Sequence, residues 1–192
     1  MSERKRALRS ELIAARALVS PDERRARSLA IADRIEEVPG FLASRTLAVY
    51  APLGTEVDTS EIARRAAARG ARLLFPRAVA GDRRLAFAEA RAGALVRGPL
   101  GALEPPPDAP EVPGEQIECV VVPGVAFSED GLRLGRGGGH YDATLEGMPR
   151  ALRVGVAFDV QIVPALPREP HDARLDALVS ETRALRFERE SG

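Results

Sequence analysis

The strongest constraint on the fold is the apolar run IECVVVP at residues 117–123. A continuous run of β-branched residues is typical of a strand that is covered on both faces, as in the middle of a parallel sheet. We therefore predict a central strand here. Similar runs predict further strands at 46–52, 71–76, 84–90 and 152–158, and final edge strands at 177–181 and 184–188.

Helical segments separate several of these runs. Apolar residues at helical spacing predict a helix over residues 3–18, and a capping box at 20–23 predicts a second helix to about residue 37. The segment 58–61 begins a third helix, which Gly70 ends. Strands that alternate with helices predict an α/β fold, with a mainly parallel sheet and helices on both faces.

Composition limits the domain number and the class of protein. A chain of 192 residues with 45% hydrophobic residues can bury one core, so we expect a single domain over residues 1–192. The formal net charge is zero, and aromatic residues are few, which argues against a general binder of nucleic acids or membrane surfaces. No long apolar segment or signal-like start is found, so we expect a cytoplasmic protein.

Two further features of the sequence are a loop segment and a single cysteine. Residues 98–115 are rich in proline and glycine and predict a surface loop. Cys119 lies inside the central apolar run, where a small core residue is the simplest interpretation.

The segment 133–142, RLGRGGGHYD, contains four glycines within five positions. It follows a predicted strand and precedes a short predicted helix near Tyr141, an arrangement in which bare backbone N–H groups can approach an anion. Arg133 and Arg136 add donors that suit phosphate or carboxylate. The spacing matches neither a Walker P-loop nor a Rossmann fingerprint, and a flexible or tightly turned loop is the alternative interpretation.

Two aspartates are candidate ligands of a divalent cation. Asp142 ends the glycine segment, and Asp172 follows Pro170 and His171 in a later loop. Magnesium sites commonly combine one or two carboxylates with substrate phosphates. Alternatively, Asp142 caps a helix and Asp172 is a turn residue.

Three other charged residues are candidates for ligand binding. Lys5 is the only lysine, and Arg9 lies four positions later on the same helix face, where like charges repel unless an anion lies between them. Glu56 follows the first strand and is suited to binding a heterocycle that carries N–H donors. A solvated helix face and a surface carboxylate are the respective alternatives.

These segments together resemble the 5-formyltetrahydrofolate cyclo-ligase family, also called methenyltetrahydrofolate synthetases. The resemblance covers residues 5 to about 181 and rests on seven segments in order: KRALR (5–9), YAPLGTEVDT (50–59), LFPR (74–77), GALEP (101–105), VVPGVAF (121–127), RLGRGGGHYD (133–142) and HDARLD (171–176).

The resemblance implies a reaction and a fold. ATP would phosphorylate the formyl oxygen of 5-formyltetrahydrofolate, nitrogen 10 would attack the activated carbon, and loss of phosphate would give 5,10-methenyltetrahydrofolate and ADP, with Mg²⁺ required. The implied fold is the NagB/RpiA/CoA-transferase-like α/β domain. We expect small-molecule substrates, no nucleic-acid or membrane partner, and a monomer.

The resemblance also implies roles for individual residues. The catalytic residues would be Arg136 and Lys5. The ATP-binding residues would be Lys5, Arg9, Arg133, Leu134, Gly135, Arg136, Gly137, Gly138, Gly139, His140 and Tyr141. The folate-binding residues would be Ala51, Glu56, Arg136, Gly137, Gly138, Gly139 and His140. The magnesium ligands would be Asp142 and Asp172.

Two positions depart from the family's usual pattern. His140 stands where the family usually has tyrosine, and Ala143 stands where many members have arginine. A role that needs only the backbone at 140 survives this change, and an imidazole would add a group that titrates near neutral pH.

The departure at position 140 keeps alternatives open. A non-catalytic nucleotide- or folate-binding paralogue on the same scaffold is the first. A metal-dependent hydrolase that uses His140, Asp142, His171 and Asp172 is the second. An RNA-binding module is the third, which the neutral charge and scarce aromatics disfavour.

Overall fold

A seven-stranded sheet forms the centre of the computed structural model, which describes residues 3–169 and 172–188. The strand order is β12-β11-β9-β6-β1-β2-β3. The bounds are β1 (Thr46–Ala48), β2 (Arg72–Ala78), β3 (Leu85–Glu89), β6 (Cys119–Val122), β9 (Leu152–Val156), β11 (Ala177–Val179) and β12 (Ala184–Arg186).

The central strands run parallel, which confirms the predicted sheet type. β1 pairs in parallel with both β2 and β6, and β9 pairs in parallel with both β6 and β11. Only the edge strands β3 and β12 are antiparallel. Each follows its neighbour after a few residues, and so short a connection cannot make the crossover that a parallel pair needs.

The predicted position of one late strand was wrong. Residues 177–181 were expected at an edge, but β11 lies between β9 and β12 and is fully buried. β12 pairs with its outer side and forms the edge at this end of the sheet. Strand order depends on long-range pairing, which the local pattern does not contain.

In the described part of the chain, four α-helices pack around the sheet: α1 (Glu3–Ala17), α2 (Pro21–Arg34), α3 (Ser60–Ala68) and α4 (His140–Leu145). The capping box at the start of α2 is present, since the Ser20 hydroxyl accepts from the Glu23 N–H and the Glu23 carboxylate accepts from the Ser20 N–H. No helix in the described ranges is long and apolar enough to cross a membrane.

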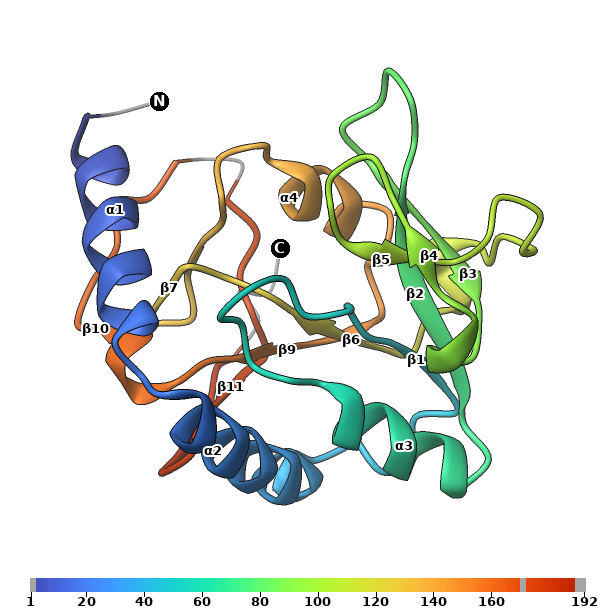
Figure 1. Ribbon diagram of the computed structural model, residues 1–192, viewed down its shortest axis with the longest axis horizontal. Coiled ribbons are helices and arrows are strands. Elements are labelled where there is room, and N and C mark those ends of the chain that lie inside the picture. The colour runs from blue at the N-terminus through green and yellow to red at the C-terminus, as the bar shows by residue number, and fades with distance from the viewer. Residues whose placement is uncertain (1–2, 170–171, 189–192) are drawn as a thin grey trace.

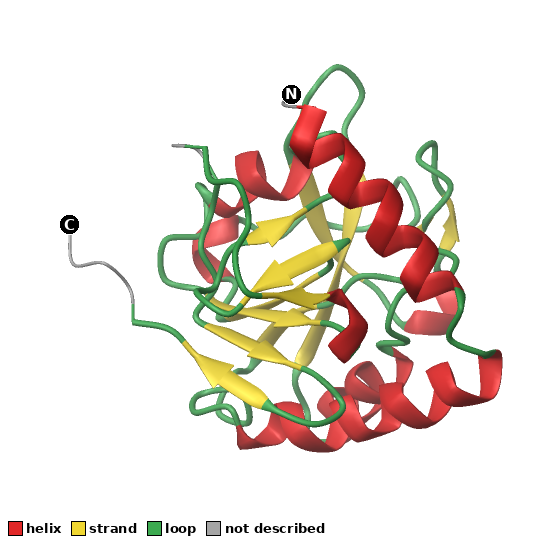
Figure 2. Cartoon of the chain, turned by 90° about the vertical axis from the view of Figure 1, so that its left-hand side faces the viewer, coloured by secondary structure: helices red, strands yellow, loops and turns green. Residues whose placement is uncertain are grey.

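Helices cover both faces of the sheet (Figures 1 and 2). On one face, Ile31 and Ile35 of α2 and Ile62 of α3 share a buried cluster with Val121 and Val154. On the other face, Leu145 of α4 and Phe127 pack with Leu74 and Val120. Successive side chains of each strand point to opposite faces of the sheet, so the strands contribute to two separate apolar layers.

A small sheet was missed by the sequence prediction. Its strands are β10 (Ile162–Val163), β7 (Ala126–Ser128) and β8 (Arg133–Leu134), in that order. Leu12 of α1 packs against this sheet in a cluster with Leu132 and Leu134. Strands of two or three residues are too short to show a period in the sequence.

The predicted loop at 98–115 is also partly structured. β4 (Val96–Arg97) and β5 (Leu103–Glu104) form an antiparallel hairpin that overlaps the start of this segment. We call residues 96–104 the β4–β5 hairpin.

Candidate active site

A cavity of about 640 Å³ opens at the carboxyl ends of β1 and β6. Tyr50 and Ala51 follow β1, and Pro123 and Gly124 follow β6; all four line the cavity. From β1 the chain continues to β2 on one side, whereas β6 pairs on the other side. Ligands of open α/β sheets bind at such a switch point, and the volume suits a small molecule.

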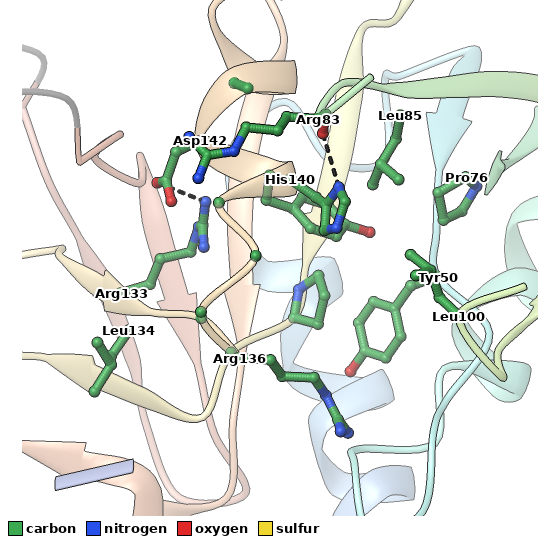
Figure 3. Close-up of a pocket in the computed structure, with 18 of the residues that line it drawn as sticks. Tyr50, Pro76, Arg83, Leu85, Leu100, Arg133, Leu134, Arg136, His140 and Asp142 are labelled. Carbon is green, nitrogen blue, oxygen red and sulfur yellow. Dashed lines mark hydrogen bonds and ion pairs between the residues drawn. The ribbon is translucent and has the colours of Figure 1, made fainter. Parts of the chain in front are cut away.

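Every residue that the sequence singled out for the site lines this cavity. They come from α1, the segment after β1, the glycine segment, α4 and the segment before β11: Lys5, Arg9, Ala51, Glu56, Arg133, Leu134, Gly135, Arg136, Gly137, Gly138, Gly139, His140, Tyr141, Asp142 and Asp172. Figure 3 shows several of them around the opening.

The glycine segment joins β8 directly to α4. Gly137 and Gly139 have φ of 111° and 69°, in the left-handed region that side chains rarely adopt. A Cβ at Gly138 would lie 2.6 Å from the His140 ring. Glycine is therefore required here by backbone conformation and by close packing, and the bare backbone faces the cavity.

Lys5 is buried between two carboxylates. Its side-chain amine lies 2.7 Å from Glu169 and 2.9 Å from Asp172, and the residue is only 4% exposed. Burial alone lowers the pKa of Lys5, but the hydrogen bonds and charges of Glu169 and Asp172 outweigh it and raise the pKa above its usual value. The amine therefore remains a cation at neutral pH.

Arg9 ties α1 to the glycine segment. Its Nε donates to the Gly135 carbonyl oxygen at 2.7 Å. The two cations of α1 thus contact different segments: Lys5 contacts two carboxylates, and Arg9 contacts the backbone of the glycine segment. The carboxylates of Glu169 and Asp172 offset the repulsion that is expected between Lys5 and Arg9.

Arg133 and Asp142 form a buried ion pair. The distance is 2.8 Å, and the Arg133 side chain is 2% exposed. Burial lowers the pKa of Arg133, which Asp142 opposes. The guanidinium also lies 5.7 Å from the centre of the Tyr141 ring. Burial raises the pKa of Tyr141, so its hydroxyl stays protonated, with no hydrogen-bond partner among the described residues.

The two candidate metal ligands lie in adjoining segments. Asp142 accepts from the Ala173 N–H at 3.3 Å, and Asp172 accepts from the Glu169 N–H at 2.7 Å. Within residues 3–169 and 172–188, no three acidic, histidine or cysteine side chains cluster as a metal cage. Two carboxylates fit Mg²⁺ that takes its remaining ligands from phosphate and water. The hydrolase alternative relied on His171, which lies outside the described residues.

Arg136 and Glu56 pair across the mouth of the cavity. Nε and Nη2 of Arg136 lie 3.1 and 2.9 Å from one Glu56 oxygen, and the other oxygen accepts from the Leu53 N–H at 2.9 Å. The Arg136 side chain is 51% exposed. The guanidinium is therefore open to solvent, whereas the Glu56 side chain is only 10% exposed.

His140 connects the glycine segment to the β2–β3 hairpin. Its Nδ1 lies 2.8 Å from the Arg83 carbonyl oxygen, a contact that Figure 3 marks. This contact is made by the imidazole of His140. The effect of His140 on catalysis stays a prediction.

One wall of the cavity was not predicted from the sequence. Pro76 and Leu85 belong to the β2–β3 hairpin, and Leu100, Leu103 and Glu104 belong to the β4–β5 hairpin. In Figure 3, Tyr50, Pro76, Leu85 and Leu100 lie opposite Arg133 and Asp142. The available signals were LFPR (74–77) and GALEP (101–105) in the family resemblance, to which no role was assigned. The cavity therefore has a charged half and an apolar half.

The fold and the cavity together define an α/β protein with a binding site for an anionic, partly apolar small molecule at the switch point of its sheet. Comparison with known sequences identifies the family. The 5-formyltetrahydrofolate cyclo-ligase family matches residues 1–181, and the chain belongs to it.

Relatives agree along most of the chain. A 5-formyltetrahydrofolate cyclo-ligase of Mycolicibacterium smegmatis is 34% identical over 75% of this chain and 77% of its own. The Escherichia coli K12 protein of the same name is 30% identical over 88% of this chain and 95% of its own.

Solved structures agree with the fold. The 5,10-methenyltetrahydrofolate synthetase of Aquifex aeolicus superimposes with a TM-score of 0.84 at 30% identity, covering 98% of this chain and 95% of that one. The synthetase of Mycoplasma pneumoniae gives a TM-score of 0.76 at 23% identity, covering 92% and 98%, and supports the fold alone.

Proposed function

We propose that this enzyme converts 5-formyltetrahydrofolate to 5,10-methenyltetrahydrofolate, with ATP giving ADP and phosphate. One observation carries the proposal beyond family membership. Residues from α1 and the glycine segment, together with Glu169 and Asp172, line a single cavity, and an apolar wall lies opposite them. The charged half suits a phosphorylated ligand, and the apolar half suits a flat heterocycle.

The charged half would hold the triphosphate. Backbone N–H groups of Gly137, Gly138 and Gly139 would approach its oxygens, and Lys5 and Arg9 would offset its charge. Mg²⁺ held by Asp142 and Asp172 would supply further positive charge to the phosphate oxygens. In phosphoryl transfer the protein acts mainly by positioning and by charge stabilisation, which is what these groups provide.

The exposed Arg136 would act at the transferring group. Its present partners, Glu56 and the Leu53 carbonyl oxygen, lie beside the apolar half, and the side chain would leave them to reach the phosphate. Glu56 and Ala51 would then contact the folate. The formyl oxygen would attack the terminal phosphate, and nitrogen 10 would displace phosphate in the ring closure.

The direct test mixes the protein with MgATP and 5-formyltetrahydrofolate. We expect near-ultraviolet absorbance of the methenyl product to rise together with ADP. Asp142→Asn is the better variant than alanine, because asparagine keeps an acceptor for the buried Arg133, whose unpaired charge would cost about 3–5 kcal/mol. Turnover in Asp142→Asn should fall by roughly 100-fold or more if charge stabilisation is lost.

Asp108→Asn is the matched control, because Asp108 is exposed and lies outside the cavity. Its rate should equal that of the unmodified protein. Unchanged turnover in Asp142→Asn would remove the metal role, and absence of product in the unmodified protein would contradict the proposed reaction.

The paralogue alternative rests on His140, whose ring contacts Arg83 where the family usually has tyrosine. Binding of MgATP or folate without any methenyl product would favour it. We further propose that the chain acts as a cytoplasmic monomer of one domain, without a nucleic-acid or membrane partner. Sedimentation velocity would check the oligomeric state.

A further inference from the structure

The end of the turn between β2 and β3 is bonded to α4 through two side chains. The His140 Nδ1 lies 2.8 Å from the Arg83 carbonyl oxygen, and the Thr144 hydroxyl accepts from the Leu85 N–H at 2.9 Å. Because a carbonyl oxygen can only accept, Nδ1 carries the proton of the first bond. His140 and Thr144 lie one helical turn apart on α4, so both bonds leave the same helix face. α4 therefore fixes this end of the turn.

Arg83 is the residue of this turn that reaches the cavity. It lines the cavity, and its side chain is exposed, with no hydrogen-bond or ion-pair partner among residues 3–169 and 172–188. The other arginines that line the cavity each contact an oxygen of the protein: Arg9, Arg133 and Arg136. The Arg83 guanidinium is thus available to an anion without the loss of an existing contact.

Arg83 lies at the boundary between the two halves of the cavity. His140, which holds its backbone, ends the glycine segment of the charged half, and Leu85, two residues along the chain, belongs to the apolar half. In the view of Figure 3, the Arg83 side chain lies between Asp142 and Leu85. With the triphosphate in the charged half and the folate in the apolar half, the terminal phosphate lies at this boundary, because it passes from one ligand to the other.

The transferred phosphate needs positive charge around it. In the proposed reaction the formyl oxygen forms a bond to the terminal phosphorus, and the bond from this phosphorus to the bridging oxygen of ADP breaks, so negative charge moves onto ADP. A planar guanidinium offers several N–H donors that match phosphate oxygens. In phosphoryl transfer, an arginine that reaches the transferred group from a separate loop can stabilise this charge. Arg83 comes from such a loop.

We propose that Arg83 binds the terminal phosphate of ATP and stabilises its charge during transfer, and that His140 is the positioning residue that holds Arg83 at the boundary. This inference rests on the proposed function and adds these two roles to it. Arg83 would touch the reacting phosphate and is the catalytic residue of the pair. His140 would act through the backbone of Arg83.

The first test compares MgATP with MgADP in the absence of folate, when no acceptor for the phosphate is present. In Arg83→Gln, calorimetric titration should show a roughly tenfold loss of affinity for MgATP, as for a lost charged hydrogen bond, with the affinity for MgADP within about twofold. With folate present, kcat should fall as well. Arg84→Gln is the matched control, because Arg84 is exposed in the same turn and lies outside this cavity. It should change none of these values.

The second test separates the donor of His140 from its ring. His140→Phe keeps a ring beside Gly138 but has no donor for the Arg83 carbonyl oxygen, so kcat/KM for ATP should fall roughly tenfold. His140→Asn keeps a side-chain N–H close to the position of Nδ1 and should lose several-fold less. The melting temperatures of both variants, measured in parallel, show whether each is folded.

The third test joins the two residues in a double variant. If His140 acts through Arg83, His140→Phe should have little further effect on kcat/KM for ATP once Arg83→Gln is present. A role of His140 in folding alone would lower the rate by the same factor in both backgrounds.

Each contrary outcome has a defined meaning. Unchanged MgATP affinity in Arg83→Gln, equal losses for MgATP and MgADP, or an effect confined to the KM for folate would overturn the role of Arg83. Independent effects in the double variant, or equal losses in His140→Phe and His140→Asn, would overturn the role of His140. If the unmodified protein makes no methenyl product, the proposed reaction fails, while the titrations with MgATP and MgADP still decide whether Arg83 binds the terminal phosphate.

Discussion

Lys5 is the only lysine of the chain, and its side chain is buried. Its amine lies between Glu169 and Asp172, in a space that a compact ammonium fills. Arginine keeps the charge but is longer and planar, so its fork cannot occupy the same position. We expect Lys5→Arg to lower kcat/KM for ATP by roughly tenfold or more, measured as ADP release.

Arg6→Lys is the matched control, since Arg6 is exposed on the same helix. It exchanges the same two residue types outside the cavity and should leave the rate unchanged. Full activity of Lys5→Arg would mean that the charge alone matters and that the identity of the residue does not.

At the scale of elements, the junction between β8 and α4 depends on a left-handed glycine. Alanine at Gly139 must adopt φ near 69°, which costs about 1 kcal/mol. Gly70, at the end of α3, has φ of 84° and also has open space around its Cα. We expect Gly139→Ala and Gly70→Ala to lower the melting temperature similarly, by roughly 2–4 °C.

Activity should separate these two variants. Gly139→Ala alters the backbone that lines the cavity and should reduce turnover, whereas Gly70→Ala lies far from it and should not. Equal activities would show that the glycine segment is needed only for folding.

α3 carries a second prediction at this scale. Hydrogen bonds from Arg64 and Arg65 lower the pKa of Glu61 to about 2. A depressed carboxyl pKa stabilises the folded state above the unfolded value and loses this effect as the pH falls toward the folded value. The melting temperature of Glu61→Gln should therefore lie below that of the unmodified protein at pH 7, and the difference should shrink between pH 4.5 and 2.

A difference that stays constant across this range would contradict the assignment. Glu115→Gln, which lacks such arginine partners, should show no pH-dependent difference from the unmodified protein.

At the scale of the whole molecule, ligand binding should stabilise the folded state, because residues from both ends of the chain line the cavity. At a hundred times its dissociation constant, a ligand stabilises the folded state by about 2.7 kcal/mol, which raises the melting temperature by roughly 5–10 °C. We expect MgATP to produce this rise. Mg²⁺ alone should produce almost none, since two carboxylates already paired with cations make a weak site without phosphate.

Asp142→Asn should remove the difference between ATP and MgATP in this measurement. A large rise with Mg²⁺ alone would instead indicate a metal site that the protein completes by itself, and would favour the hydrolase alternative.

The elements were largely predictable because their causes are local. The apolar run around Val120, the capping box at Ser20 and the glycines at 137 and 139 each act through neighbours in the chain. The candidate site residues were predictable for a second reason, namely their order in a family resemblance. The short strands of the small sheet gave no such pattern, since their stability comes from pairing and from packing with α1.

By itself, the sequence determined which segments are strands or helices, and at which positions glycine is needed so that no side chain covers the backbone. Only the tertiary structure decided which charges meet, because Lys5 and Asp172 are 167 positions apart and pair only after the sheet has ordered its strands. It also decided the apolar wall of the cavity, whose residues come from two hairpins that lie far apart from the glycine segment in the chain. Burial and unmet hydrogen bonds are properties of surrounding atoms, and a chain acquires those surroundings only when it folds.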